Sequence, residues 1–256
     1  MVALNCEAVS VSLGGRSVVR ELSASLGGGS LVGVLGPNGA GKSTLMRALA
    51  GLARYSGRVF VEGKDLAGQS RAEIARRIAY LPQGQTLHWP LAVERLVGLG
   101  RLPHLAPMSR IGDADKGAIE RSMQRADVAH LAGRTATELS GGERARVLMA
   151  RALAVEAPIL LADEPLASLD PAHQIGGMEI LREEAAAGAL VVAVMHDLTL
   201  AYRHCDRILL MHDGALIADG PPAEVLTADN LAAVYGVSAF LGGAGQSLLV
   251  PLERLR

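Results

Sequence analysis

The sequence predicts an α/β fold: a mostly parallel sheet as core, an antiparallel β region at the N-terminus and an inserted helical subdomain. Three observations support this prediction. Short apolar runs such as "PILLA" and "ALVVAVM" alternate with helical segments, which is typical of parallel strands covered on both faces. Alternating residues and glycines fill the first thirty positions. Residues 84–157 have helical periodicity and no clear strand.

The elements of the first third follow in a simple order. Antiparallel strands and turns precede a buried strand "LVGVLG", and a helix begins after Gly41. A second β region, "YSGRVFVEGKDL", leads to a helix whose start carries Ser70 and Glu73 in the spacing of a capping box. The strand "IAYLP" then ends at Pro82 and Gln83, where the helical insertion begins.

The last hundred residues return to alternating strands and helices. The strand "PILLADEP" is followed by a helix over 171–187 and the strand "LVVAVMHD". The segment "DRILLMHDGALIADG" predicts two strands joined by an Asp-Gly turn, and helical turns over 221–235 close the chain.

Length and composition fit one domain over residues 1–256. Half of the residues are apolar, which is enough to bury a large core, and no repeat, low-complexity tract or long linker interrupts the chain. We expect residues 1–83 and 158–256 to form the core with its β region, and residues 84–157 to form the helical subdomain.

Charge and cysteine content exclude several classes of protein. The 25 basic and 26 acidic residues leave a net charge of −1, which gives no general attraction for nucleic acid or an anionic membrane. Two cysteines, Cys6 and Cys205, cannot form a disulfide framework and favour a reducing cytosol. We expect no signal peptide, and no apolar run approaches the roughly 20 residues that span a bilayer. If the protein works at a membrane, other chains supply the span.

The segment "GPNGAGKST" fits the G-x-x-x-x-G-K-[ST] pattern of a phosphate-binding loop between a strand and a helix. Its glycines let backbone N–H groups and the helix N-terminus point at phosphate oxygens. We expect Lys42 to reach the β and γ phosphates, Ser43 to bind Mg²⁺, and Thr44 to hold the α-phosphate side. The alternative is a glycine-rich turn with a structural role only, but such a turn would not require a lysine that points into it. The candidate nucleotide-binding residues are Gly36, Pro37, Asn38, Gly39, Ala40, Gly41, Lys42, Ser43 and Thr44.

Two carboxylates, Asp163 and Glu164, follow the buried run "ILLA" at the sheet edge that carries the phosphate loop. Carboxylates there are costly unless a cation or a proton uses them. We predict that Asp163 holds Mg²⁺ through its water shell and that Glu164 polarises the attacking water as general base. A solvated strand end is the alternative.

His196 and Gln83 are further candidates because each follows a strand. A lone histidine such as His196 is more often a core or surface residue, but beside Glu164 it can donate a hydrogen bond to the γ-phosphate. Gln83 can touch Mg²⁺ or its water, and an ordinary loop glutamine is an equal alternative. The other six histidines show no ligand spacing with cysteine or carboxylates, so we predict no structural metal.

The stretch "LSGGERARVLMARALA" contains a second glycine-rich turn at the start of a helix. Ser140 and Glu143 fit a capping box, but capping does not explain why Gly141 and Gly142, poor helix formers, occupy the first turn. Glycines there leave backbone N–H groups open to an anion. Because the phosphate loop belongs to the sheet and this turn to the helical insertion, we expect the anion to come from a nucleotide held by a second copy.

In this order and at these separations, "GPNGAGKST", the glutamine after "YLP", "LSGGE", "LLADEP", "SLD" and "MHD" resemble the ATP-binding subunit of an ABC transporter. The resemblance covers essentially the whole chain and implies ATP and Mg²⁺ as ligands of a P-loop NTPase-type core. It also implies a head-to-tail homodimer in which Ser140, Gly141 and Gly142 contact the γ-phosphate held by the other subunit. Asp170, in "SLD", would bridge the two sites.

Within this family the chain is similar to the importer branch for iron-siderophores, haem and cobalamin. The similarity lies in "LVGLGRLPH", "LDPAHQ", "MHDLTLAYRHCDRILLMHDG" and "GPPAEVLTADNLAAVYGV". It implies a peripheral subunit at the cytoplasmic face of the inner membrane. Its partners would be integral membrane permease subunits and, indirectly, a periplasmic substrate-binding protein, with no nucleic acid.

Three alternatives stay open. Zinc and manganese importers are the nearest relatives with which this branch can be confused. A soluble ABC ATPase of translation or DNA repair resembles paired cassettes or carries long coiled-coil insertions, whereas this chain has one set of motifs. An ATP-gated clamp that barely hydrolyses is the third alternative, and the presence of Glu164 with His196 argues against it.

The chain departs from the family where an aromatic residue usually stacks on adenine, because the matching residue is Leu13. We predict weak discrimination between ATP and GTP, and tighter ATP binding by Leu13→Tyr by up to about 1 kcal/mol. Base stacking on a ring is worth about 1 to 3 kcal/mol, and ordering the ring offsets part of it. Titrations of both proteins with both nucleotides test this. Strong ATP preference without the substitution, or no gain with it, would mean that Tyr55 or the stem of Arg16 already covers the base.

Overall fold

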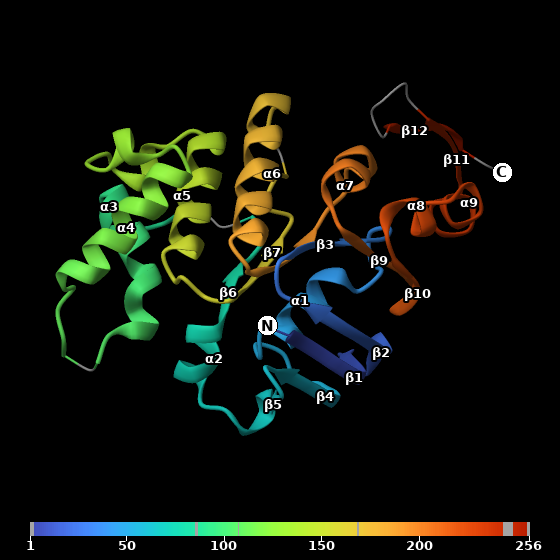
Figure 1. Ribbon diagram of the computed structural model, residues 1–256, viewed down its shortest axis with the longest axis horizontal. Helices are drawn as coiled ribbons and strands as arrows, with labels where there is room; N and C mark the ends of the chain where they lie inside the picture. The colour runs from blue at the N-terminus through green and yellow to red at the C-terminus, as the bar shows by residue number, and fades with distance from the viewer. Residues whose placement is uncertain (1–2, 85–86, 107, 168, 243–247, 255–256) are drawn as a thin grey trace.

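The core of the molecule is a six-stranded sheet in the order β10-β9-β3-β8-β7-β6 (Figure 1). The computed structural model describes residues 3–84, 87–106, 108–167, 169–242 and 248–254. Five strands pair in parallel and β10 is antiparallel to β9, which confirms the mostly parallel α/β core. The strands are β3 (Ser30–Leu35), β6 (Ile78–Leu81), β7 (Ile159–Asp163), β8 (Leu190–Val194), β9 (Arg207–His212) and β10 (Ala215–Gly220).

A second, antiparallel sheet lies at the N-terminus, as the sequence predicts. Its order is β2-β1-β4-β5, and the long β1–β2 hairpin is irregular at several points along its register. Helix α1 (Lys42–Leu49) packs its apolar side chains into one buried cluster with residues of both sheets. This helix therefore joins the N-terminal sheet to the core. The strands are β1 (Ala3–Leu13), β2 (Arg16–Gly27), β4 (Ser56–Val61) and β5 (Lys64–Asp65).

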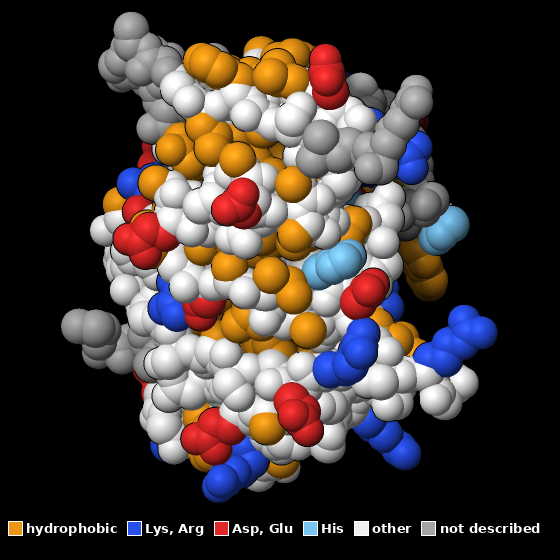
Figure 2. All heavy atoms as spheres, turned by 90° about the vertical axis from the view of Figure 1, so that its right-hand side faces the viewer, with side chains coloured by type: hydrophobic (Ala, Val, Ile, Leu, Met, Phe, Trp, Pro, Cys, Tyr) orange, Lys and Arg blue, Asp and Glu red, His pale blue; other side chains and the backbone are white. Residues whose placement is uncertain are grey.

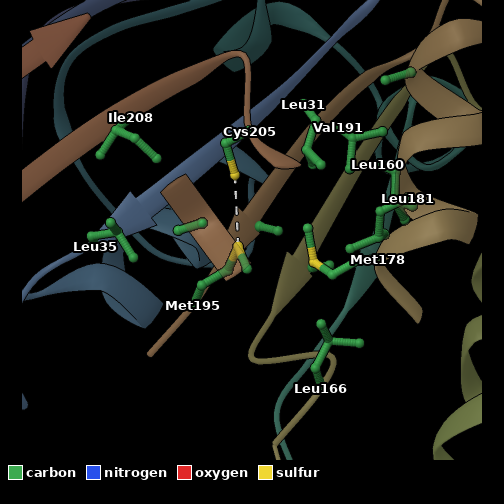
Figure 3. Packing of buried hydrophobic residues seen from close by; sticks show 14 of the residues in the cluster. Leu31, Leu35, Leu160, Leu166, Met178, Leu181, Val191, Met195, Cys205 and Ile208 are labelled. Atoms are coloured by element: carbon green, nitrogen blue, oxygen red, sulfur yellow. Dashed lines mark hydrogen bonds between the residues drawn. The ribbon is translucent and has the colours of Figure 1, made fainter. Parts of the chain in front are cut away.

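Helices cover the other face of the core sheet. Side chains of α6 (Pro171–Ala186) and the strands interlock in a second buried cluster, where Met178 and Leu181 meet Leu160 and Val191 (Figure 3). Helix α7 (Leu198–His204) belongs to the same layer. The thiol of Cys205 lies 3.7 Å from the sulfur of Met195 (Figure 3).

The described residues between β6 and β7 form helices joined by turns and loops, and their only β pairing is the isolated bridge between Ala92 and Thr135. Their apolar side chains form a third buried cluster. Arg101, which is buried, pairs with Asp115 at 2.9 Å and Glu156 at 3.0 Å, and so ties the parts of this region together. The elements are α3 (Val93–Gly98), η2 (Leu99–His104), α4 (Asp113–Arg125), η3 (Ala129–Leu131), η4 (Ala136–Glu138) and α5 (Gly141–Leu153).

Local signals in the sequence agree with the observed element ends. Both the Ser70 box at α2 (Arg71–Arg77) and the Ser140 box at α5 have their reciprocal hydrogen bonds. In the β9–β10 turn, Asp213 and Gly214 have φ of 47° and 81°, the left-handed pair that a tight hairpin requires. A short 3₁₀ turn, η1 (Leu66–Gly68), precedes α2.

The C-terminal segment contains a feature that the sequence analysis missed. After α8 (Pro222–Val225) and α9 (Ala228–Tyr235), β11 (Val237–Gly242) and β12 (Leu248–Arg254) form a separate hairpin. Leu249 is fully buried, and the Thr199 hydroxyl of α7 donates to its carbonyl oxygen. This side of the molecule mixes apolar side chains with charges of both signs (Figure 2). No helix in the described ranges has the length and apolar character needed to cross a bilayer.

Candidate functional site

The carboxyl ends of four strands meet at one groove of about 600 Å³. β3 leads into the phosphate loop, β7 ends at Asp163 and is followed by Glu164, β8 is followed by His196, and β6 by Gln83. The sequence-predicted residues from these four places therefore lie together. The residues lining the groove are Val18, Asn38, Gly39, Gly41, Lys42, Ser43, Thr44, Gln83, Glu164 and His196.

The phosphate loop needs its glycines for two different reasons. Gly36, Gly39 and Gly41 all have positive φ, at 150°, 84° and 95°. A Cβ on Gly36 would lie 2.2 Å from the carbonyl oxygen of Met211, and one on Gly41 would lie 2.5 Å from that of Val18. A Cβ on Gly39 would meet nothing within 4 Å, so only its backbone conformation requires glycine. The loop is thus packed against backbone of β9 and β2 while its centre stays open.

Lys42 lies folded back into this loop. Its Nζ donates to the carbonyl oxygens of Gly36 at 2.7 Å and Pro37 at 2.9 Å, and the residue is 5% exposed. Burial lowers the pKa of the amine, and the negative charges of Glu164 and Asp163 oppose that shift. The two carbonyl oxygens and the two carboxylates favour the charged form of the Lys42 amine. The groove therefore contains a positive charge that can bind phosphate.

Asp163 is 1% exposed and lies between two hydroxyl groups. Its Oδ1 accepts from Ser43 Oγ at 2.9 Å, and its Oδ2 accepts from the Tyr80 hydroxyl at 3.3 Å. Burial raises the pKa of the carboxyl, and the hydrogen bond from Ser43 opposes the shift. Tyr80 was not predicted as a site residue, because its place beside Asp163 depends on the pairing of β6 with β7.

The Glu164 carboxylate is held between an imidazole and an amide. Its Oε1 lies 2.6 Å from His196 Nε2, and its Oε2 accepts from Gln83 Nε2 at 2.5 Å. Glu164 has φ of 52°, a left-handed conformation that a residue with a side chain adopts at a cost of about 1–3 kcal/mol. The backbone thus turns sharply after β7, which brings the carboxylate to the edge of the phosphate loop.

The second glycine-rich turn lies elsewhere. Neither Ser140, Gly141 nor Gly142 lines the groove of the phosphate loop. Gly141 instead lines a neighbouring cavity of about 260 Å³ that also contains Gln83 and Glu164. Within one chain, this turn and the phosphate loop therefore do not share a nucleotide pocket.

Comparison with known proteins identifies the family. Residues 19–167 match the family described as "ABC transporter". The chain belongs to the ABC transporter family. A hemin import ATP-binding protein of Pseudomonas fluorescens (strain Pf-5) is 43% identical, over 93% of this chain and 94% of the relative. A cobalamin import ATP-binding protein of Halobacterium salinarum (strain R1) is 44% identical over 94% of this chain, which spans only 61% of that relative.

Solved ABC proteins have the same fold. An inward-facing ABC transporter, described as of the metal-chelate type, gives a TM-score of 0.86 at 28% identity, covering 99% of this chain and 98% of the other. The ATP-binding cassette of another ABC transporter, in its ADP conformation, gives a TM-score of 0.81 at 25% sequence identity. The match covers 92% of this chain and 98% of the other. The chain therefore has the fold of an ABC ATPase, the ATP-binding subunit of such transporters.

Among the described residues that line the nucleotide groove of this ABC subunit, none is a phenylalanine, tyrosine or tryptophan. Leu13 is 50% exposed at the end of β1, where it pairs in register with Arg16. Tyr55 packs against the cluster around α1, and burial, with a smaller effect from the negative charge of Asp65, raises the pKa of its hydroxyl. Neither Tyr55 nor Arg16 lines the groove, whereas Val18 does. The Leu13 prediction stays a prediction.

The buried carboxylate gives a prediction about stability. Because the pKa of Asp163 is raised in the folded protein, folding becomes less favourable as pH rises above the ordinary aspartate value of about 3.9. Asp163→Asn should therefore melt at a higher temperature than the unsubstituted protein at pH 8 without nucleotide or Mg²⁺, by roughly 2–4 °C for each kcal/mol gained. The gain should vanish as pH falls towards about 4.

Calorimetry over this pH range, with Asp113→Asn as control, checks the prediction. Asp113 has a side chain that is 98% exposed, so the control removes one negative charge without relieving burial. An Asp163→Asn protein no more stable than the unsubstituted one at pH 8 would contradict the interpretation.

Proposed function

We propose that this chain hydrolyses ATP as the motor of a membrane importer, working as a head-to-tail homodimer beneath a permease. The observation that carries the proposal is Glu164, held by His196 at 2.6 Å and Gln83 at 2.5 Å beside the phosphate loop. A base, a hydrogen-bond donor and a phosphate cradle at one groove fit the hydrolysis of a phosphoanhydride.

ATP phosphates would lie against residues 36–44, with Lys42 leaving its two carbonyl partners for the β and γ phosphates. The Ser43 hydroxyl and the Asp163 carboxylate, 2.9 Å apart, are hard oxygen donors of the kind that Mg²⁺ prefers. We assign Ser43, Asp163 and Gln83 to the metal or its water. Bound there, Mg²⁺ would neutralise charge on the phosphates.

Glu164 would take the proton of the attacking water, since its carboxylate is at the groove and accepts from two donors. Those donors also set its orientation. When phosphate enters, the His196 Nε2–H can turn from the carboxylate to a γ-phosphate oxygen and stabilise developing charge. Gln83 lies at the start of the helical insertion and contacts Glu164. Binding of nucleotide at the site would therefore change the position of that region through Gln83.

A second copy would complete each site. Ser140 caps α5 while Gly141 and Gly142 occupy its first turn, so the helix N-terminus offers backbone N–H groups to an anion. Because this turn lies outside the phosphate groove of its own chain, we assign it to the γ-phosphate of the partner's ATP. Asp170, the N-cap of α6, would lie between the two sites.

A permease would bind between the core and residues 84–157, which we treat as a helical subdomain because they have their own buried cluster. A groove of about 470 Å³ there has an apolar lining from α2, the end of α1 and Pro103. Leu52, in its lining, is 58% exposed, and Leu99 and Leu102, in the same 3₁₀ helix as Pro103, are 41% and 59% exposed. Such a surface suits the cytoplasmic side of a membrane protein.

Haem is the cargo that the relatives favour. The hemin import relative matches along 94% of its length, whereas the cobalamin import relative extends well beyond this chain. Haem and cobalamin are both metal chelates, and the structural neighbour is described as an ABC transporter of the metal-chelate type. A periplasmic binding protein would deliver haem to the permease, and the ATP subunit itself would touch no cargo.

Substitution of the base tests the motor chemistry. We expect Glu164→Gln to lower steady-state ATPase by about 100-fold or more, because a general base contributes 10²–10⁴-fold. ATP and Mg²⁺ binding should persist, and gel filtration in ATP should give a dimer. Adding Ser140→Arg should abolish that dimer and leave nucleotide binding to the monomer within about twofold. ATPase near the original rate in Glu164→Gln, or lost monomer binding through Ser140→Arg, would refute the assignments.

Transport of cargo is tested on the assembled complex. Affinity-tagged chain purified from its own membranes should bring down a polytopic permease, and the complex in liposomes should take up haem with ATP. Glu164→Gln in the same complex is the matched control and should take up none. Uptake of cobalamin but not haem would correct the cargo, and recovery of the chain without any membrane protein would refute the importer.

A further inference from the structure

Asp170 and His173 form a tight pair at the start of α6. Asp170 Oδ1 accepts from the backbone N–H of His173 at 3.0 Å, the ordinary bond of a helix N-cap. Its second oxygen, Oδ2, pairs with the imidazole Nδ1 of His173. Because an ionised carboxylate only accepts, Nδ1 carries the proton. These bonds hold the pKa of Asp170 below its usual range, so the carboxylate is charged and fixed in direction.

The same imidazole lies over the glycine turn of α5 in its own chain. A Cβ on Gly142 would be 3.8 Å from His173 Nδ1 and Cε1, and 3.9 Å from Leu169 Cδ2. A Cβ on Gly141 would meet nothing within 4 Å. The ring and Leu169 therefore cover one side of this turn at Gly142, while Gly141 faces open space.

The turn is braced on its other side as well. Glu143, which caps the N–H of Ser140 at 2.8 Å, forms an ion pair with Arg134 at 2.8 Å. The turn thus lies between a bracing ion pair within the helical region and the His173 ring of the core helix α6. Helix capping needs only the first Asp170 oxygen, so the imidazole bond and the position of the ring beside Gly142 call for another reason.

We propose that His173 is a positioning residue that joins Asp170 to the Ser140–Gly142 turn, so that the two move together. The inference rests on the proposed dimer, in which the turn of one chain binds the partner's ATP and Asp170 lies between the sites. Capture of phosphate at the turn then shifts Asp170 through the His173 ring. Closure of one ATP site thereby changes the geometry of the other.

Kinetics of the full chain test the link. His173→Ala should lower kcat roughly tenfold, because a small displacement near reacting groups has an effect of that order or more. ATP binding to the monomer should stay within about twofold, and the Hill coefficient of ATPase should fall towards 1. His173→Asn, whose amide N–H can reach Asp170 in place of Nδ1, should restore most of both. Glu179→Ala, on an exposed part of α6, is the control and should change neither.

The outcomes separate this inference from the proposed function. If Glu164→Gln with His173 intact forms no dimer in ATP, the dimer fails and the link fails with it. If that dimer forms but His173→Ala keeps the original kcat and Hill coefficient, only the link is overturned. It is also overturned if His173→Asn is as impaired as His173→Ala, because the hydrogen bond to Asp170 then plays no part.

Discussion

The register of three parallel strands is the constraint on which the site depends. Val34 of β3, Val194 of β8 and Asp163 of β7 lie level with one another across the sheet. All three strands end at or within one residue of these positions, so the segments that follow them leave the sheet at one edge. A shift of one residue in any strand would turn its side chains to the opposite face. Both faces of these strands are buried in closely packed clusters, so such a shift would mismatch side-chain volumes on both faces, and the packing of the core sets the geometry of the catalytic groups.

The price of this arrangement is electrostatic. Asp163 and Lys42 are almost completely buried, and burial disfavours the charged form of each. Hydroxyl and carbonyl groups supplied by Ser43, Tyr80 and the loop backbone compensate only in part. The left-handed conformation of Glu164 adds backbone strain. A polyphosphate with a divalent cation relieves several of these costs at once, which explains why a stable chain tolerates them.

Much of this could be predicted from the sequence because the signals are local. The phosphate loop, the capping boxes and the Asp-Gly turn each depend on a few adjacent residues, and the apolar runs mark the strands. Tyr80 could not be found in this way, since its contact with Asp163 depends on which strands are neighbours. The β11–β12 hairpin was missed because its sequence has weak alternation, and buried Leu249 is fixed by α7 rather than by its own propensity. The position of His173 beside Gly142 likewise depends on how two helices approach.

The burial of both thiols affects how this subunit withstands oxidation. Burial raises the pKa of Cys6 to about 11 and that of Cys205 to about 12, so the reactive thiolate is scarce at neutral pH. Peroxide would meet the exposed thioether of Met108 well before either thiol. Methionine sulfoxide is reversible, and Met108 lies outside the nucleotide groove. Oxidative damage would therefore begin at a repairable surface position and leave the ATP site intact.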